Sequence, residues 1–279
     1  MKRVLITGSG GMLGSEMVQF YSEKKVDVIE VDISNADVTK KDDIIPFIFN
    51  NKPDLVIHCA GYTNVDICEE EIDMAYKVNA VGIQNVCLAC KRLKIPVVYF
   101  STDYVFDGLK QSPYIEFDVP NPLNVYGKSK LAGEIIVKDL MREFFIIRTS
   151  WLCGHKGRNF VETILNLSKT RDTIGVVDDQ VGSPTFVPDL IKETNRVIES
   201  GAFGVYHISN KGICSWFNFA KKIIEYSGIS NVEIVPIKSS KLERKAKRPL
   251  YSKLKNYMLE LTIGDNISDW EESLRNYLK

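Results

Sequence analysis

Short apolar runs alternate with amphipathic stretches through the first 150 residues of the chain. Runs rich in β-branched residues predict strands at 3–7, 27–32, 54–59, 96–101 and 144–149. The intervening stretches have helical spacing and predict helices at 12–24, 41–50, 72–92 and 126–140. Near-continuous apolar strands that alternate with helices are typical of a parallel sheet covered on both faces. We therefore expect an α/β fold with a doubly wound parallel sheet.

The second half of the chain alternates less regularly. It predicts strands at 174–178, 205–209 and 232–235 and helices at 159–170, 188–199, 216–227 and 268–278. The run 205–209 is apolar enough to return to the main sheet. We therefore assign residues 1–150 and 186–212 to the sheet domain. Residues 151–185 and 213–279 are expected to form a smaller C-terminal α/β lobe over the carboxyl ends of the strands.

Composition narrows the classes of function. Hydrophobic residues make up 44% and charged residues 26% of the 279 residues, and the formal net charge is zero, so no overall positive field attracts nucleic acid or a membrane surface. Eight Lys or Arg lie in 238–255, which we interpret mainly as a solvated face without a nucleic-acid motif. No apolar run approaches the roughly 18 residues of a membrane span. The start of the chain has no signal-peptide pattern, so we expect a cytoplasmic protein.

A glycine-rich loop follows the first predicted strand. Gly8, Gly11 and Gly14 are spaced three residues apart, and Met12 and Leu13 open the next helix. Glycines at this place allow a tight turn and let the backbone approach a diphosphate, and the helix N-terminus favours its negative charge. The loop therefore predicts a dinucleotide cofactor.

Residues after the next strands extend this predicted cofactor site. Asp32 ends the second strand, where a carboxylate accepts hydrogen bonds from a ribose 2′-hydroxyl and repels a 2′-phosphate, so NADH is favoured over NADPH. Asp37 and Val38 are expected to flank the adenine. Small residues after the strand at 54–59 leave room for the cofactor, which gives the further candidates Cys59, Ala60, Gly61 and Thr63.

A tyrosine and a lysine form the candidate catalytic pair. Tyr126 and Lys130 are four residues apart and share one face of a predicted helix. A nearby ammonium lowers the pKa of a phenol, so we expect Tyr126 to give a proton to a carbonyl oxygen as hydride arrives at carbon. Thr102 comes directly after the predicted strand at 96–101 and is expected to donate to the same oxygen. Lys130 would also hold the nicotinamide ribose.

These motifs resemble those of the extended short-chain dehydrogenase/reductases and, among them, the dTDP-4-dehydrorhamnose reductases. The resemblance covers nearly the whole chain and includes segments 8–14, 60–66, 101–106, 126–130, 148–151, 159–160, 179–185 and 247–249. It implies a Rossmann domain and NAD(P)H-dependent reduction of the C4 keto group of dTDP-4-dehydro-6-deoxy-L-mannose to dTDP-L-rhamnose, for cell-surface polysaccharide. Similar dehydratases carry Asp-Glu after the hydroxyl residue. Tyr104 takes the Glu position here, which argues against dehydration.

The resemblance also implies a substrate site and a catalytic triad of Thr102, Tyr126 and Lys130. The residues expected to contact the sugar nucleotide are Val65, Thr102, Asp103, Tyr126, Trp151, Asn159 and Arg248. Arg248 is the candidate partner of the diphosphate. Some family members form a dimer through a magnesium site of glutamates. Glu16 matches one ligand there but Asp189 replaces another, so we predict no metal and leave open whether the chain forms a homodimer.

Two alternatives compete with the reductase. A regulatory subunit of methionine adenosyltransferase resembles this family and acts by contact with its partner enzyme, so the chain could be a non-catalytic nucleotide-binding subunit. The intact Thr-Tyr-Lys set argues against that interpretation. The chain could also be a reductase or epimerase of another nucleotide 4-keto sugar.

Overall fold

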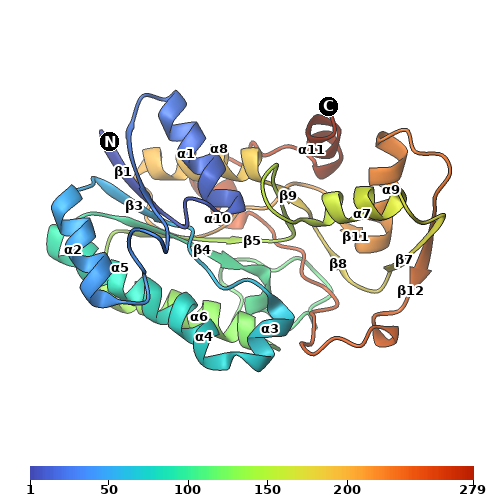
Figure 1. The fold of residues 1–279 in the computed structure, drawn as a ribbon, viewed down its shortest axis with the longest axis horizontal. Helices are drawn as coiled ribbons and strands as arrows, with labels where there is room; N and C mark the ends of the chain where they lie inside the picture. Colours follow the sequence, from blue (N-terminus) through green and yellow to red (C-terminus); the bar gives the residue numbers. More distant parts are fainter.

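The computed structural model describes all 279 residues, and its central element is a six-stranded parallel sheet (Figure 1). The strands are β1 (Arg3–Thr7), β2 (Asp27–Val31), β3 (Leu55–His58), β4 (Val97–Thr102), β5 (Phe144–Thr149) and β10 (Gly204–His207). Their order is β10-β5-β4-β3-β1-β2, so the direction of winding reverses between β1 and β3. This confirms the doubly wound fold and the return of the run at 205–209 to the sheet.

Helices cover both faces of this sheet because its strands are apolar on both sides. Helices α1 (Met12–Glu23) and α8 (Val187–Ser200) pack on one face, and α2 (Lys41–Asn51), α5 (Ile83–Leu93) and α6 (Val125–Leu140) pack on the other. Within β1, Val4 and Ile6 join the first core cluster whereas Leu5 joins the second. Each strand therefore contributes alternate side chains to two separate hydrophobic cores.

The stretch predicted as one helix at 72–92 is interrupted. It contains α4 (Ile72–Tyr76), a π-helical segment η1 (Lys77–Gly82) and α5, and a short helix, α3 (Val65–Glu70), precedes it. The Tyr99 hydroxyl donates to the carbonyl oxygen of Asn79 within η1 at 3.0 Å. A side-chain donor at a helical carbonyl is a known cause of such irregularity, and the sequence pattern of the helix alone does not reveal it.

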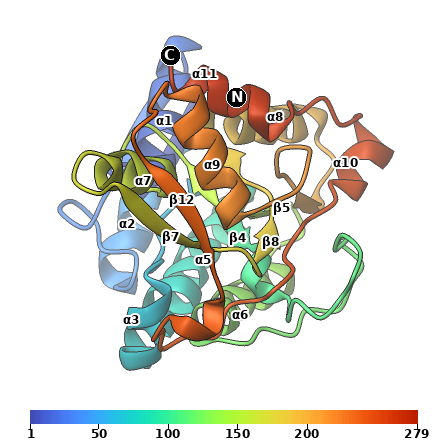
Figure 2. The same ribbon diagram turned by 90° about the vertical axis from the view of Figure 1, so that its right-hand side faces the viewer.

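The smaller lobe lies beside the sheet, to the right in Figure 1 and facing the viewer in Figure 2. Strands β7 (Thr173–Val177) and β12 (Glu233–Ile237) pair in parallel. Helices α7 (Phe160–Ser168), α9 (Trp216–Tyr226) and α11 (Trp270–Tyr277) contribute to the lobe's own core, with Phe219 fully buried. Two short strand pairs complete it: β6 (Leu152–Cys153) with β9 (Thr185–Phe186), and β8 (Val181–Gly182) with β11 (Cys214–Ser215).

Three short helices were not predicted from the sequence in addition to α3: η2 (Asp103–Val105), η3 (Ser239–Lys241) and α10 (Tyr257–Thr262). Leu259 of α10 and the following Ile267 belong to the core cluster of α1 and α8 rather than to that of the lobe. The chain thus returns to the sheet domain near its C-terminus. None of the helices combines the length and the apolar character needed to cross a bilayer.

Candidate active site

The glycine loop lies where β1 passes into α1, at the point where the winding of the sheet reverses. Gly8 has a φ of +66°, and a Cβ on it would lie 2.7 Å from the backbone nitrogen of Ala60. A Cβ on Gly14 would lie only 2.0 Å from the carbonyl oxygen of Gly8. Side chains are therefore excluded where strand, loop and helix meet. No side chain caps the N-terminus of α1 and its first turn has no acidic residue, so this backbone fits the phosphates of a dinucleotide.

The Asp32 side chain closes one side of this loop. Its Oδ2 accepts from the backbone N–H of Gly10 at 3.0 Å and its Oδ1 accepts from that of Ile33 at 2.8 Å. Asp32 is half-buried, and its carboxylate lies next to the glycine loop, as the prediction of a ribose contact requires. Asp37 and Val38, which were predicted to flank the adenine, are less available for contact with a cofactor. Asp37 accepts from both the N–H and the hydroxyl of Thr39, and Val38 is buried.

The segment after β3 lies beside the glycine loop, where the backbone of Ala60 approaches Gly8. Cys59 and Ala60 are half-buried, whereas Gly61 and Thr63 are exposed. A Cβ on Gly61 would meet no atom closer than the Oδ1 of Asn79, at 3.5 Å. A side chain at Gly61 would therefore meet only ordinary van der Waals contacts, and the cofactor contacts of this segment stay a prediction.

Helix α6 brings Tyr126 to the end of β4. Asn124 caps the helix by accepting from the N–H of Gly127 at 2.8 Å, which fixes where the helix begins. A Cβ on Gly127 would lie 2.1 Å from the carbonyl oxygen of Tyr104, so α6 packs directly on the turn after Thr102. The rings of Tyr104 and Tyr126 meet edge-to-face, with centroids 5.8 Å apart.

Lys130 is buried one turn further along α6. Its Nζ lies 4.1 Å from the centroid of the Tyr99 ring, and no carboxylate lies within ion-pair distance of it. Burial lowers the pKa of Lys130 to about 7, against the opposing charge of Glu134. Burial also raises the pKa of Tyr126 above its usual range. The expected lowering of the Tyr126 pKa by Lys130 is therefore not found in this structure, where loss of hydration is the largest effect.

Thr102 is the last residue of β4 and is buried with Asp103. Its hydroxyl donates to Oδ1 of Asp103 at 3.0 Å and accepts from the N–H of Tyr104 at 3.1 Å. Burial raises the pKa of Asp103 to about 7. Thr102 and the start of α6, which carries Tyr126, thus meet at the carboxyl edge of the sheet, and Lys130 lies one helical turn along α6, over the Tyr99 ring.

Comparison with known proteins agrees with this site. Residues 1–279 match the protein family described as "RmlD substrate binding domain". The chain belongs to this family.

Similarity to individual members of the RmlD family extends over the full length of the chain. A dTDP-4-dehydrorhamnose reductase of Aggregatibacter actinomycetemcomitans is 39% identical over 99% of this chain and 98% of its own. The crystal structure of a dTDP-4-dehydrorhamnose reductase from Clostridium acetobutylicum has a TM-score of 0.97 at 46% identity, over 99% of this chain and 98% of that one. A Bacillus anthracis dTDP-4-dehydrorhamnose reductase in complex with NADP has a TM-score of 0.96 at 42% identity, with the same coverage.

In this RmlD-family chain, Trp151 follows β5 and packs against the core of the lobe. Its φ is +48°, a conformation that residues other than glycine rarely adopt. Its ring stacks on Trp216, with centroids 3.6 Å apart, and a Cβ on Gly182 would lie 2.8 Å from it. The half-buried ring is therefore rigidly held. Val65, also half-buried, opens α3 on the sheet domain.

Two residues that were predicted to bind the substrate, Asn159 and Arg248, form hydrogen bonds within the protein. Asn159 caps α7 through its Oδ1, and its amide donates to the carbonyl of Gly154 and to the Tyr277 hydroxyl. Both N–H donors and one of the two acceptor lone pairs of its side chain are used, so Asn159 has a structural role in this fold. Arg248 donates from Nη1 and Nη2 to the two oxygens of Asp66, both at 2.7 Å. This bidentate pair lowers the pKa of Asp66 to about 2 and fastens the C-terminal segment to α3.

Several residues near the site were missed by sequence reasoning. Asn79 lies in the π-helical segment, with its amide bound to Tyr62 and Ser129. Burial and the neighbouring Arg248 lower the pKa of Arg244, and Tyr104 and Asp66 act in the opposite direction. No hydrogen bond or ion pair occupies the exposed Arg244 side chain. Arg244 belongs to the basic segment 238–255 of the sequence. Only the structure shows that Arg244 is unpaired whereas Arg248 is paired with Asp66.

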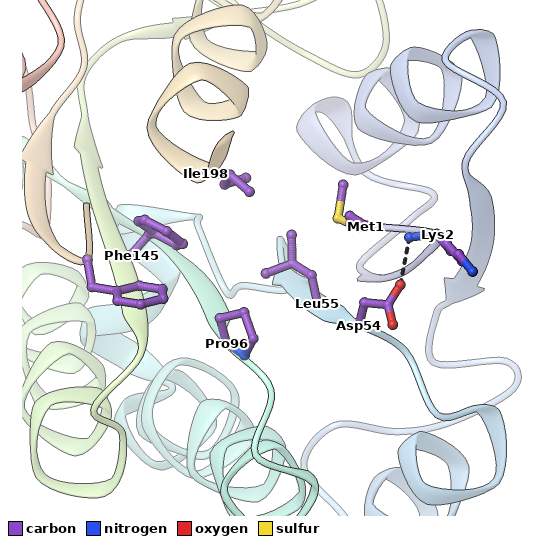
Figure 3. Close-up of a pocket in the computed structure, with 8 residues that line it drawn as sticks. Met1, Lys2, Asp54, Leu55, Pro96, Phe145 and Ile198 are labelled. Carbon is purple, nitrogen blue, oxygen red and sulfur yellow. Dashed lines mark hydrogen bonds between the residues drawn. The ribbon is translucent and has the colours of Figure 1, made fainter. Parts of the chain in front are cut away.

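A hollow of about 550 Å³ lies at the opposite, amino end of the sheet (Figure 3). Its wall is mostly apolar and includes Leu55, Pro96 and Phe145, and Asp54 there accepts from the N–H of Lys2. In open α/β sheets ligands bind at the carboxyl ends of the strands. This hollow is therefore separate from the candidate active site.

Proposed function

We propose that this chain catalyses the NADH- or NADPH-dependent reduction of dTDP-4-dehydro-6-deoxy-L-mannose at C4, giving dTDP-L-rhamnose for cell-surface polysaccharide. The observation that carries the proposal is the convergence of Thr102, Tyr126 and Lys130 beside a side-chain-free phosphate cradle. Membership of the RmlD family supports it, and family members similar along the whole chain are named dTDP-4-dehydrorhamnose reductases. NADH or NADPH would supply the hydride. The chain supplies the orientation and the proton.

The electrostatics of the pair favour the reductive direction. Because burial raises the pKa of Tyr126, the free enzyme holds the neutral phenol, which is the form able to give a proton to the keto oxygen. Thr102 would donate to the same oxygen and stabilise its developing negative charge. Lys130 would bind the nicotinamide ribose and, as an ammonium, stabilise the phenolate that remains on Tyr126.

The substrate would occupy the space between the sheet domain and the lobe. We retain residues 1–150 with 186–212 and 151–185 with 213–279 as the two domains, except that the segment around α10 packs on the sheet domain. Val65, Asp103 and Trp151 are proposed sugar contacts. Since Arg248 is paired with Asp66, we propose the unpaired Arg244 as the contact for the diphosphate.

For the cofactor we propose a preference for NADH. The support is Asp32, whose carboxylate lies beside the glycine loop, where a 2′-phosphate would meet a negative charge. The Bacillus anthracis relative was crystallised with NADP, so the test is a direct comparison of kcat/KM with the two reduced dinucleotides. An Asp32→Ala variant should gain relative activity with NADPH.

We propose a cytoplasmic location for this chain. The six cysteines are all free thiols in the structure, which suits the reducing cytoplasm that we propose. Sedimentation-equilibrium measurements would decide directly between a monomer and a homodimer.

The decisive test of the function is turnover of dTDP-4-keto-6-deoxy sugars, followed by nicotinamide absorbance and by NMR of the product. Tyr126→Phe removes only the hydroxyl, so we expect it to bind the dinucleotide normally and to lose most of kcat. Normal turnover by this variant would refute the mechanism. Product NMR would identify a different keto sugar, and absence of oxidation together with a stoichiometric partner protein would favour the regulatory subunit.

A further inference from the structure

The single hydroxyl proton of Thr102 is committed in this structure. Thr102 donates it to Oδ1 of Asp103 and accepts from the N–H of Tyr104. A threonine hydroxyl has only one proton to donate. While that proton points to a carboxylate, Thr102 has none for a substrate oxygen. The catalytic role proposed for Thr102 therefore requires a change at Asp103.

Asp103 lies in surroundings that disfavour its charge. It is 2% exposed and its second oxygen, Oδ2, is buried without a hydrogen-bond partner. No Lys or Arg forms an ion pair with it, which is unusual for a buried carboxylate. Its titratable neighbours are Tyr104 on η2 and Tyr126 on α6, both of which are neutral phenols at ordinary pH. From the C-terminal segment the uncharged Ser252 hydroxyl faces it; burial raises the pKa of Asp103, and Ser252 and Thr102 oppose this effect without cancelling it.

We propose that Asp103 is a positioning residue that supports catalysis in its neutral form. A neutral Asp103 donates its O–H to Thr102, and Thr102 then turns its own proton toward the keto oxygen. Two donors, Tyr126 and Thr102, are then directed at the oxygen that gains negative charge. Asp103 keeps its proton throughout and transfers nothing. This inference rests on the proposed reductase function and adds a residue that sets the direction of one hydrogen bond.

The proposal gives the reaction a pH dependence of defined sign. Burial raises the pKa of Asp103 to about 7, so the neutral form is the main one below that pH and is lost above it. Turnover should therefore fall as pH rises through this range. Removing one donor of this kind costs about 10²–10³ in kcat in other enzymes. Since Tyr126 remains, we expect a fall of about tenfold or more.

Asp103→Asn tests the proposal because the two side chains have nearly the same shape. The asparagine amide donates to Thr102 at every pH, so kcat of the variant at saturating substrate, which sets aside the proposed sugar contact of Asp103, should lose the fall at alkaline pH. Asp103→Ala should be slow across the range, because it restores no donor. Lys130 is the main competing group, since its pKa is also lowered to about 7. If Asp103→Asn keeps the alkaline fall of the wild type, Lys130 or another group causes it and the proposal is overturned.

A measurement without substrate separates this inference from the function. In the infrared difference between wild type and Asp103→Asn, a protonated carboxyl band should be present at pH 6 and absent at pH 9. A carboxylate at both pH values would overturn the inference even if the enzyme is active. If the wild type shows the band but reduces no dTDP-4-keto sugar, the proposed substrate fails while the assigned state of Asp103 stands. Dinucleotide binding and circular dichroism of both variants confirm that they are folded.

Discussion

Glu134 and Arg148 form a bidentate ion pair near the candidate catalytic Lys130. Arg148 donates from Nε to Oε1 of Glu134 at 2.9 Å and from Nη2 to Oε2 at 2.6 Å. Both side chains are almost completely buried. Ser101 adds a third contact, donating to Oε1 of Glu134 at 2.5 Å. Ser101 immediately precedes Thr102 in β4, and Glu134 lies one turn after Lys130 in α6. Glu134 therefore joins α6 to β5 through Arg148 and to β4 through Ser101, and α6 and β4 carry the candidate catalytic residues.

Breaking this pair should be costly. Glu134→Leu leaves Arg148 buried without its counter-charge, and such a change typically destabilises a protein by about 3–5 kcal/mol. We expect a loss of this size in the free energy of unfolding measured with urea. The matched control is the double variant Glu134→Leu, Arg148→Met, which removes both charges and should be clearly more stable than the single variant. Equal stability of the single variant and wild type would contradict this account.

Binding of the cofactor should change the protonation of Lys130. Burial lowers its pKa to about 7 in the free protein, so at pH 8 most molecules hold a neutral amine. The diphosphate and ribose oxygens of a bound dinucleotide favour the ammonium, so binding at pH 8 should take up part of a proton. Calorimetric titrations in two buffers of different ionisation enthalpy measure this uptake. It should shrink in Lys130→Met, and equal uptake in that variant would assign the proton to another group.

The sequence could predict the catalytic centre because its geometry is local. Strand ends in a parallel sheet meet at one edge, so Thr102 after β4 and the glycine loop after β1 were expected at the same edge, where only β3 separates their strands. Tyr126 and Lys130 share a face because they are one turn apart in a helix.

Interactions between distant segments were not predictable in this way. The hydrogen bonds of Arg248 join residues 182 positions apart, and nothing in the Lys-Arg-Pro pattern shows that Asp66 occupies the guanidinium. The pKa of Tyr126 was predicted in the wrong direction because burial depends on how the whole chain folds. Asn159 looked free in the sequence, but Tyr277, 118 residues away, takes up its amide.

The assignment of the diphosphate contact to Arg244 can be tested directly. Arg244 has no internal partner, whereas Arg248 is held by Asp66. Arg244→Ala should therefore raise KM for the sugar nucleotide by about tenfold, the value of one charge-assisted contact, with little change in kcat or in stability. Lys241→Ala, which removes an exposed charge from the nearby η3, is the control and should leave KM unchanged. A larger KM effect from Lys241 than from Arg244 would show that general surface charge, rather than one contact, binds the substrate.

The phosphate cradle should tolerate a methyl group at one glycine far better than at another. A Cβ at position 14 would lie 2.0 Å from the carbonyl oxygen of Gly8, whereas a Cβ at position 11 would lie 3.2 Å from the same atom. In Gly14→Ala the backbone of β1 and α1 must separate, so we expect at least a tenfold rise in the Kd for the dinucleotide and a lower Tm. In Gly11→Ala a shift of a few tenths of an ångström suffices, and both changes should be smaller. Fluorescence titration of the reduced nicotinamide and thermal unfolding measure the two quantities. Similar Kd values for the two variants would show that close approach at Gly14 does not shape the cofactor site.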